Sequence, residues 1–399
     1  MQGLRKWLTP ELMAVLLSCS FAFFAAGMLY PILPLYLQEA GVDPGTIGMI
    51  FLVMTLATAV SEFFWGWMVD RIDLRIAMIV GTVVLGLVTV AFRYAPNTNA
   101  FFLAGFLFGF FRSPLYVVGR WYMGVNAPPA MKTVAMASLG TIFSIAQSAA
   151  GFTTGFVTDA YGYSAVIWVA AVLPFVAGLM LLVASPWLDF RRRHSFERPS
   201  FAEAHTSGGG ATSSLWTVFW LGLVASAYFV TVGILLAYLP LFTTEVVGAD
   251  VRQVGILFGI QGLVYAVAMP PIGRLADRMG KTKFLPAGLA LVTFSMAGVV
   301  LSKSYGAVLF CIVLYALGSS IYEPAGIAVL SERVSPERQG RAIGIYALLE
   351  DVGWMIGPAL GGMLWGASGA QAPFVLAAGA AGIGFALSLW LMRTLLAKG

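Results

Sequence analysis

Long apolar segments recur along almost the whole chain, and this pattern restricts the fold more than any other feature of the sequence. A membrane-spanning helix needs about 20 predominantly apolar residues, and the 399-residue chain contains twelve runs of roughly that length. They lie near residues 11–37, 45–69, 76–94, 99–120, 133–157, 164–187, 215–242, 253–273, 283–302, 305–330, 342–366 and 371–392. Charged residues make up only 10% of the chain, whereas soluble domains carry about 25%. The sequence therefore predicts an all-α membrane protein with twelve transmembrane helices.

The basic residues are distributed unevenly between the two sides of these spans. Of the 23 Lys and Arg residues, nineteen fall in segments that are cytoplasmic if the N-terminus is inside. Three fall on the other side, and Arg112 lies within a span. Cytoplasmic loops of membrane proteins carry such an excess, so we expect a cell (inner) membrane protein with both termini in the cytoplasm. This topology accounts for the net charge of +5 without a nucleic-acid partner.

One long polar stretch, residues 189–214, separates the first six spans from the last six. It contains three consecutive arginines and a Ser-Gly-Gly-Gly run, a composition typical of a flexible linker. We expect an N-terminal six-helix bundle at 1–188, a cytoplasmic linker at 189–214 and a C-terminal six-helix bundle at 215–399.

The two halves repeat each other at an offset of 206 to 207 residues. Residues 33–51 align with 239–258, and residues 66–71 align with 273–278. The matched pairs include Gly41 with Gly248, Asp43 with Asp250, Gly66 with Gly273, Asp70 with Asp277, Arg71 with Arg278 and Gly155 with Gly362. Duplication of this kind is typical of alternating-access transporters, and it predicts two pseudo-symmetric bundles.

Two glycine-rich motifs carry a family resemblance. Residues 273–283 read Gly-Arg-Leu-Ala-Asp-Arg-Met-Gly-Lys-Thr-Lys, and residues 353–362 read Gly-Trp-Met-Ile-Gly-Pro-Ala-Leu-Gly-Gly. With them, nearly the whole chain resembles the major facilitator superfamily, and within it the twelve-span drug:proton antiporters. In the first half Asp73 stands where the loop motif has a glycine, which predicts an altered turn there. In the antiporters the second motif belongs to span five, where this chain has only Gly151 and Gly155.

The resemblance implies a gating role for the repeated loops after spans two and eight. The residues concerned are Gly66, Asp70, Arg71, Gly273, Asp277 and Arg278, together with Gly357 and Pro358 of span eleven. Physically, glycines allow close helix contact, and a carboxylate at a helix end pairs with arginines or with a helix N-terminus. The simpler alternative is that each Asp-Arg pair only marks a cytoplasmic turn.

Five charged residues fall well inside the predicted spans: Glu62, Arg112, Glu323, Glu350 and Asp351. A charge at the centre of a membrane helix costs on the order of 3 kcal/mol, so each needs a partner, a water-filled cavity or a function. We expect Glu323, Glu62, Glu350 and Asp351 to include the proton-coupling site, because burial favours the protonated carboxyl. We expect Arg112 to bind substrate; the alternative is a fixed ion pair with Glu323 or Glu62.

The resemblance implies that spans one, four, seven and ten line a central cavity, and aromatic residues on these spans are candidates for a lipophilic pocket. They are Phe111, Tyr228, Tyr238, Tyr315 and Tyr322. The alternative is that most aromatic residues of such a chain face lipid or lie in interfacial belts.

These observations predict a secondary active transporter that exports lipophilic or amphipathic compounds in exchange for protons. A lipid or glycolipid translocator and a proton-coupled organic-anion symporter remain alternatives of the same fold. A polytopic receptor or channel would not need the duplicated loops. No nucleotide-binding, metalloprotease or nucleophile-elbow motif occurs, so we expect no enzyme activity, no cofactor and no metal. We expect a monomer whose partners are protons, a small-molecule substrate and the bilayer.

Overall fold

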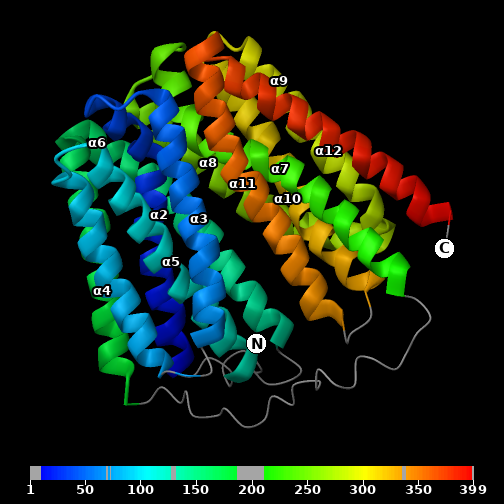
Figure 1. The fold of residues 1–399 in the computed structure, drawn as a ribbon, viewed down its shortest axis with the longest axis horizontal. Helices are drawn as coiled ribbons and strands as arrows, with labels where there is room; N and C mark the ends of the chain where they lie inside the picture. Colours follow the sequence, from blue (N-terminus) through cyan, green and yellow to red (C-terminus); the bar gives the residue numbers. More distant parts are fainter. Residues whose placement is uncertain are drawn as a thin grey trace. The chain divides into compact units, whose positions relative to one another are not determined.

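The described part of the chain is built from long helices. The computed structural model describes residues 10–68, 71, 73–126, 132–186, 211–334 and 338–397. The elements are α2 (Pro10–Glu39), α3 (Pro44–Met68), α4 (Leu74–Arg93), α5 (Thr98–Asn126), α6 (Lys132–Ala184), α7 (Ala211–Glu245), α8 (Val251–Met279), η3 (Lys281–Lys283), α9 (Phe284–Leu301), α10 (Tyr305–Arg333), α11 (Gln339–Ser368) and α12 (Ala372–Ala397) (Figure 1). Within these ranges there are no strands, and eleven helices are long and apolar enough to cross a membrane. The prediction of an all-α membrane protein is confirmed.

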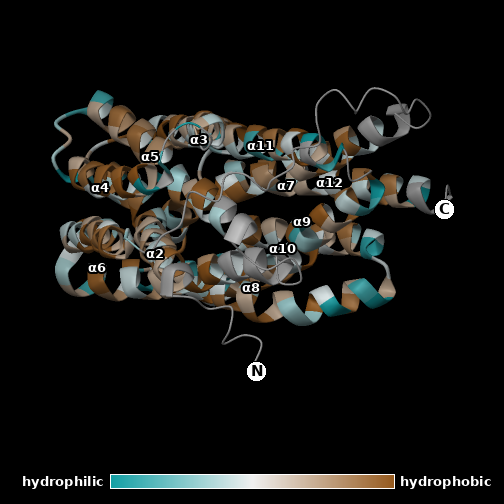
Figure 2. Ribbon diagram, turned by 90° about the horizontal axis from the view of Figure 1, so that it is seen from below, coloured by the Kyte–Doolittle hydropathy of each residue, from teal (hydrophilic) through white to brown (hydrophobic). Residues whose placement is uncertain are grey.

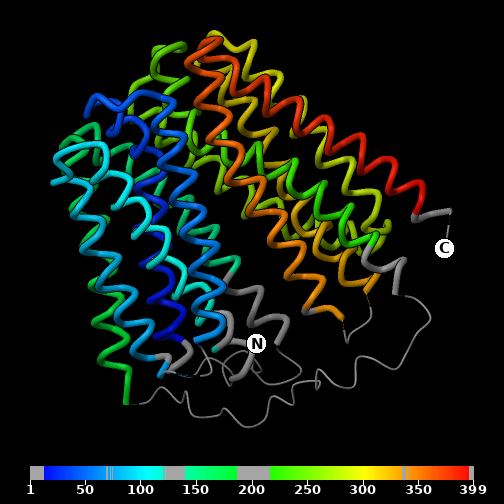
Figure 3. Tube along the Cα trace, viewed as in Figure 1, coloured from blue at the N-terminus to red at the C-terminus, as the bar shows by residue number. Residues whose placement is uncertain are grey.

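One of the eleven helices, α6, contains two predicted spans. Its 53 residues are two helical segments that meet at Gly162, whose backbone is not helical (φ 76°, ψ 175°). The chain reverses direction within α6 (Figure 3). The predicted spans 133–157 and 164–187 therefore lie in one element, and the described residues contain eleven helices rather than twelve. The reason is that a single glycine, with no intervening loop, joins the two segments.

The sequence repeat is visible in the backbone. Gly41 and Gly248 have φ angles of 82° and 73°, and Gly162 and Gly369 have φ angles of 76° and 90°. Each pair is 207 residues apart. The break inside α6 thus has its counterpart in the turn between α11 and α12, where Gly369 ends α11.

The two halves also begin equivalent helices with the same cap. Asp43 accepts hydrogen bonds from the backbone N of Thr46 at 3.0 Å and from its Oγ1 at 2.6 Å. These bonds stabilise the charged carboxylate and hold the pKa of Asp43 below its usual value. Asp250 forms a capping box with Gln253 at the start of α8. Asp43 and Asp250 therefore each cap the N-terminus of a helix, α3 and α8 respectively.

The loops that follow α3 and α8 differ, as the sequence predicts. Gly280 ends α8 with φ 91°. Asp73, its counterpart, has φ −69° and caps α4 by accepting a hydrogen bond from the backbone N of Arg75. An aspartate avoids the left-handed conformation that the glycine adopts, so the first-half turn is built differently.

The chain forms two compact units. Unit 1 comprises residues 1–36 and 53–196, and unit 2 comprises residues 37–52 and 197–399. The end of α2 and the start of α3 therefore pack with the C-terminal helices. Most of the predicted linker, residues 189–210, lies outside the described residues, and α7 already begins at Ala211. In Figure 2, hydrophobic residues predominate along the helices and hydrophilic residues gather towards their ends and turns.

In unit 2, α11 lies against α7 through a row of glycines. A Cβ at Gly353 would collide with the carbonyl oxygen of Ser226, and one at Gly357 with that of Val230. Small residues with this spacing allow helix backbones to approach closely in membranes. The close approach that the sequence predicts for the glycine motif of span eleven is present in the structure.

In unit 1, α2 packs against α6 in a related way. A Cβ at Gly27 would overlap the side chains of Gln147 and Ala150, and Thr154 Oγ1 donates a hydrogen bond to the carbonyl oxygen of Met28 at 3.1 Å. Thr154 is fully buried. The contact between α2 and α6 therefore uses small and hydroxyl side chains, whereas α11 approaches α7 through glycines.

Replacing Gly162 with alanine is expected to destabilise the protein by about 1–3 kcal/mol, because its φ and ψ are accessible essentially only to glycine. No described atom lies within 4 Å of the position that a Cβ would take, so the effect arises from the backbone alone. Thermal unfolding of the purified protein in detergent measures it.

Gly140→Ala in the same helix is the matched control, since Gly140 has neither a positive φ nor a close neighbour. It is expected to be neutral or to stabilise by up to about 1 kcal/mol. Equal effects of the two substitutions would contradict the assignment of Gly162 as the break in α6.

Candidate functional site

Unit 2 contains a carboxylate held by two tyrosines from different helices. Glu323 lies on α10. Its Oε1 accepts a hydrogen bond from the hydroxyl of Tyr228 on α7, and its Oε2 accepts one from the hydroxyl of Tyr265 on α8, both at 2.6 Å. Glu323 is only partly exposed. Hydrogen bonds to an ionised carboxylate are short and strong, so this arrangement offsets part of the cost of placing the charge inside a helix bundle.

The local sequence of α10 adds a second polar feature at this point. Pro324 follows Glu323 inside the helix. A proline has no N–H, so the helical bond to the carbonyl four residues earlier, that of Ser320, cannot form. The carboxylate therefore lies beside a weakened turn of α10, where the helix has fewer internal bonds.

Buried tyrosines surround the carboxylate. Tyr228 packs on Tyr322 with ring centroids 4.7 Å apart, and Tyr228, Tyr315 and Tyr322 are 1–2% exposed. The structure thus brings together Glu323 and three of the aromatic residues predicted to line a pocket. These three contribute hydroxyls and packing around the carboxylate, and little of their surface is accessible.

Tyr265 is the functional candidate that sequence reasoning missed. It lies in the predicted span 253–273, whereas the resemblance places the cavity-lining residues on other spans. It is less buried than the three tyrosines around it. A tyrosine in the middle of a span, on the helix that leads into a duplicated loop, was the available signal.

The polar cluster continues towards α11. The side chain of the buried Tyr346 lies close to those of Tyr322 and Glu350. Glu350 lies one helical turn after Tyr346, and Asp351 follows it; both acids are partly buried and both take part in polar or electrostatic contacts. Of the two, Glu350 is connected through Tyr346 and Tyr322 to the surroundings of Glu323.

Tyr238 lies at a different site, near the C-terminal end of α7. Its hydroxyl lies 2.8 Å from the carbonyl oxygen of Pro358 on α11 and 3.1 Å from that of Pro44 at the start of α3. The side chain is 0% exposed, and its ring packs on Trp365. Here the predicted pocket residue Tyr238 and the predicted gating residue Pro358 are in direct contact.

Unit 1 holds the other intramembrane charges. The guanidinium of Arg112 on α5 lies 6.0 Å from the ring centre of Tyr30 on α2. Phe111, next to it, packs on Phe110 at 5.2 Å. Glu62 on α3 is partly buried and takes part in a contact. The predicted pairing of Arg112 with Glu323 would join the two units and stays a prediction.

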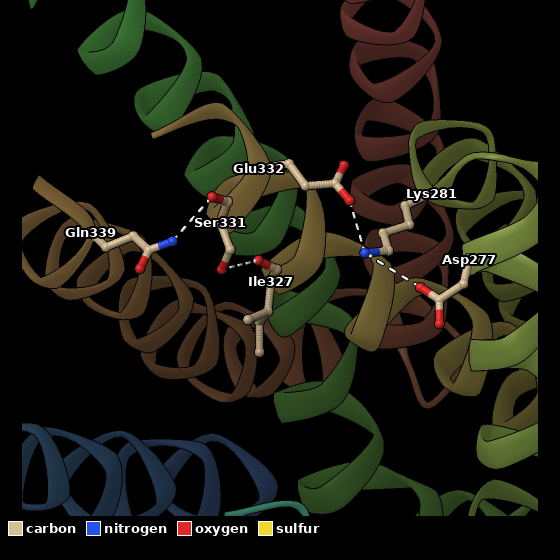
Figure 4. Close-up of polar contacts among 6 residues, drawn as sticks. All are labelled: Asp277, Lys281, Ile327, Ser331, Glu332 and Gln339. Carbon is tan, nitrogen blue, oxygen red and sulfur yellow. Dashed lines mark hydrogen bonds and ion pairs between the residues drawn. The ribbon is translucent and has the colours of Figure 1, made fainter. Parts of the chain in front are cut away.

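Lys281, just after the C-terminal end of α8, pairs with acidic residues near the C-terminal ends of α8 and α10. Its Nζ lies 2.8 Å from Glu332 Oε1 on α10 and 3.3 Å from Asp277 Oδ1 on α8 (Figure 4). Beside it, Gln339 Nε2 at the start of α11 donates to the carbonyl oxygen of Ser331 at 3.1 Å. We call Asp277, Lys281 and Glu332 the basic clamp. It makes the predicted gating residue Asp277 part of an ion-pair cluster.

The remaining predicted gating residues have fewer contacts. Arg71 donates to the carbonyl oxygen of Trp67 and stacks on its ring at 3.7 Å, and Arg278 is exposed. No described atom lies within 4 Å of where a Cβ of Gly66 or Gly273 would be. The predicted gating residue Asp70 lies outside the described residues.

Comparisons with known proteins agree with this fold. The chain matches the family profile of the Major Facilitator Superfamily over residues 15–250 and 221–397. It is 24% identical over 392 residues to the multidrug resistance protein MdtG of Proteus mirabilis, covering 92% of each chain. It is 21% identical over 339 residues to an uncharacterised MFS-type transporter of Methanocaldococcus jannaschii, covering 85% of this chain and 86% of the relative.

Among solved structures, a bacterial homologue of the human lysosomal transporter Spinster, inward-facing and unoccupied, is similar with a TM-score of 0.83 at 14% identity. The similarity covers 97% of both chains. The POT family transporter PepTSo is similar with a TM-score of 0.79 at 11% identity and covers 98% of this chain. With a family profile that covers nearly all of it and a matching fold, this chain belongs to the major facilitator superfamily and is a multi-pass membrane transporter resembling the drug:proton antiporters.

Proposed function

We propose that this protein exports lipophilic or amphipathic compounds in exchange for protons, by alternating access, and that Glu323 carries the coupling proton. The observation that carries this proposal is the carboxylate held at 2.6 Å by Tyr228 and Tyr265 from two other helices. Protonation would remove the charge that both hydroxyls stabilise, and so would change the contacts between α7, α8 and α10. The MdtG relatives, named as multidrug resistance proteins, support the substrate class.

We further propose that α6 crosses the membrane twice, which makes twelve spans in two six-helix bundles. Its apolar part is 45 residues long, about 68 Å as a helix, whereas the hydrocarbon core is about 30 Å thick. The equivalent backbone at Gly162 and Gly369 supports a turn at the same place in both halves. With even numbers of spans, both termini and the linker lie on one side, which the distribution of basic residues suggests is the cytoplasm of a cell (inner) membrane protein. The protein acts as a monomer in this proposal.

Alternating access requires contacts that form in one state and break in another. Tyr238 is well placed for this, because its single hydroxyl hydrogen serves carbonyl oxygens of both Pro358 and Pro44. The basic clamp occupies the opposite end of unit 2. We propose that Tyr238 acts in opening and closing the predicted outer end rather than in binding substrate, and that Asp277 acts at the cytoplasmic end.

The charge of Arg112 favours a second candidate function, the transport of organic anions. Its guanidinium cannot lose its charge, and it lies 6.0 Å from the ring centre of Tyr30. A carboxylate or phosphate on a substrate would neutralise it. A thermal-shift screen of lipophilic drugs, lipids and anionic metabolites at two pH values separates the two candidates by the class of compound that stabilises the protein.

Glu323→Gln is expected to abolish pH-gradient-driven dye efflux from proteoliposomes, because the amide cannot take up a proton. Substrate binding, measured by thermal shift, should remain. Glu39→Gln, an exposed glutamate at the end of α2, is the control and should transport normally. Gradient-driven efflux by the Glu323 variant would remove this residue from the coupling mechanism.

Arg112→Ala is expected to give a folded protein whose transport falls by more than about tenfold, the effect of losing about 1.4 kcal/mol of substrate interaction. Arg393→Ala, at an exposed position near the end of α12, serves as the control for loss of one positive charge. Normal transport by Arg112→Ala would refute a role in binding. Failure to fold would assign Arg112 to a structural contact instead.

Asp277→Asn removes one ion pair of the basic clamp, and exposed pairs contribute about 0.2–1 kcal/mol. The ratio of conformational states should then change by about 1.4- to fivefold. Double electron–electron resonance between spin labels at the end of α3 and the start of α11 measures that ratio. Asp159→Asn removes an exposed carboxylate from α6 and should leave the distances unchanged. An identical distance distribution in Asp277→Asn would argue against a gating role.

A further inference from the structure

One face of α2 carries three residues that α5 and α6 both approach. Phe23, Gly27 and Tyr30 are spaced four and three positions apart, so they form one stripe along the helix. We call these three residues the α2 stripe. All three are buried and belong to unit 1.

The contacts at the first residue of the α2 stripe are aromatic. The ring centre of Phe23 lies 5.0 Å from that of Phe143 on α6 and 6.1 Å from that of Tyr116 on α5. Both pairs are edge-to-face, an arrangement that aromatic rings favour. We call Phe23, Tyr116 and Phe143 the aromatic cluster. Its two outer members are partly exposed, so the cluster presents apolar surface beside a buried ring.

Each flanking helix continues from the aromatic cluster to one polar residue. Gln147 follows Phe143 by four positions on α6, and Arg112 precedes Tyr116 by four positions on α5. Four positions are about one helical turn, so each polar residue stays on the face that contacts α2. Side chains lean towards the N-terminus of their own helix, which directs the side chain of Arg112 away from Tyr116.

Both polar side chains reach the α2 stripe beyond Phe23. A Cβ at Gly27 would overlap the amide oxygen of Gln147, so the glycine provides the room for this amide. The guanidinium of Arg112 lies 6.0 Å from the ring centre of Tyr30. Gly27 and Tyr30 are about 4.5 Å apart along the helix axis. The amide and the guanidinium therefore reach α2 at levels within about one turn of each other.

An amide and a guanidinium in this arrangement suit an oxyanion. The guanidinium keeps its positive charge and carries five N–H donors, and a glutamine amide carries two. Hydrogen bonds to a charged oxygen are about twice as strong as those between neutral groups. Arg112 and Gln147 are both partly exposed. An organic cation would be repelled here, whereas a carboxylate can accept from both side chains.

We propose that Arg112 and Gln147 bind the anionic head group of a single-tailed amphipathic substrate, and that the aromatic cluster binds the adjoining part of its apolar tail. Gln147 is then a specificity-determining residue, because its N–H groups favour a head group with charged oxygens. This inference rests on the proposed export of amphipathic compounds and names the head group of those compounds as an oxyanion.

Binding of a matched pair of probes tests the head-group preference. The probes are dansylaminoundecanoic acid and its methyl ester, which share one tail and differ in charge. Energy transfer from tryptophan to the dansyl group measures Kd for the protein in phosphatidylcholine nanodiscs, with empty nanodiscs as the baseline. The wild type is expected to bind the acid about tenfold more tightly than the ester, the effect of one charge-assisted hydrogen bond. Equal affinities would overturn the proposal.

Gln147→Met is expected to raise Kd for the acid about tenfold and to change Kd for the ester by less than about twofold. Gln147→Glu keeps the size of the side chain and places a carboxylate beside the guanidinium, so it should abolish the preference for the acid; it decides the matter if Gln147→Met does not fold. Gln261→Met, at a partly exposed glutamine of α8 in unit 2, is the control and should match the wild type. Equal changes for both probes in Gln147→Met, or none, would overturn the role of Gln147.

Phe143→Ala is expected to weaken the binding of acid and ester by the same factor, because the two probes share the tail. Phe294→Ala removes an exposed ring from α9 and should leave both Kd values unchanged. A loss confined to the acid would contradict the assignment of the tail to the aromatic cluster.

Phosphatidylglycerol in the nanodiscs tests whether a bilayer lipid occupies the site instead. An unchanged Kd for the acid is expected. Competition by this two-tailed anionic lipid would overturn the assignment to a single-tailed substrate.

Two outcomes separate this inference from the proposed function. If the Gln147 variants keep the wild-type preference while the wild type shows gradient-driven efflux, the oxyanion site is overturned and the exporter stands. If the wild type shows no gradient-driven efflux but binds the acid in a way that depends on Gln147, the proposed export is wrong and the binding site stands.

Discussion

The hydrocarbon core of a bilayer offers no hydrogen-bond partner to a peptide group, and the architecture of this chain follows from that constraint. Each backbone polar group has to be satisfied within the protein, which accounts for helices throughout the described ranges. The break inside α6 falls at a glycine, Gly162, which can adopt the non-helical backbone found there. The same constraint explains the glycine seam between α7 and α11: lipid tails provide no hydrophobic drive for helices to associate, so close backbone packing has to hold them together.

A carboxylate in this setting is expensive, and the structure shows how the cost is reduced. Glu323 is bonded to hydroxyls from α7 and α8 and lies beside the turn that Pro324 weakens. Because its partners lie on two other helices, any change in its charge acts on three helices at once. This geometry makes a buried acid suitable for coupling a proton to a helix rearrangement, whereas an acid paired within its own helix would affect only that helix.

Much of the fold could be predicted because the relevant signals are local. Hydropathy marks each span, and the matched glycines Gly41 and Gly248 belong to the sequence repeat; both have positive φ angles in the structure. The Asp73 substitution predicted an altered turn, and the backbone there is indeed different from that at Gly280. The twelve predicted spans fall in eleven helices of the described residues, since the segments 133–157 and 164–187 join at Gly162 within α6 without an intervening loop.

The sequence by itself determined the membrane class, the positions of the spans, the duplication and the presence of Glu323 within a span, because these depend on residues that are neighbours along the chain. Only the tertiary structure decided that Tyr265 and Tyr228 share the Glu323 carboxylate, and that residues 37–52 pack with the C-terminal helices. Such contacts depend on how each helix is rotated and how far apart neighbouring helices lie. Those quantities are set by side-chain volumes on several helices together, and no single segment of the sequence contains them.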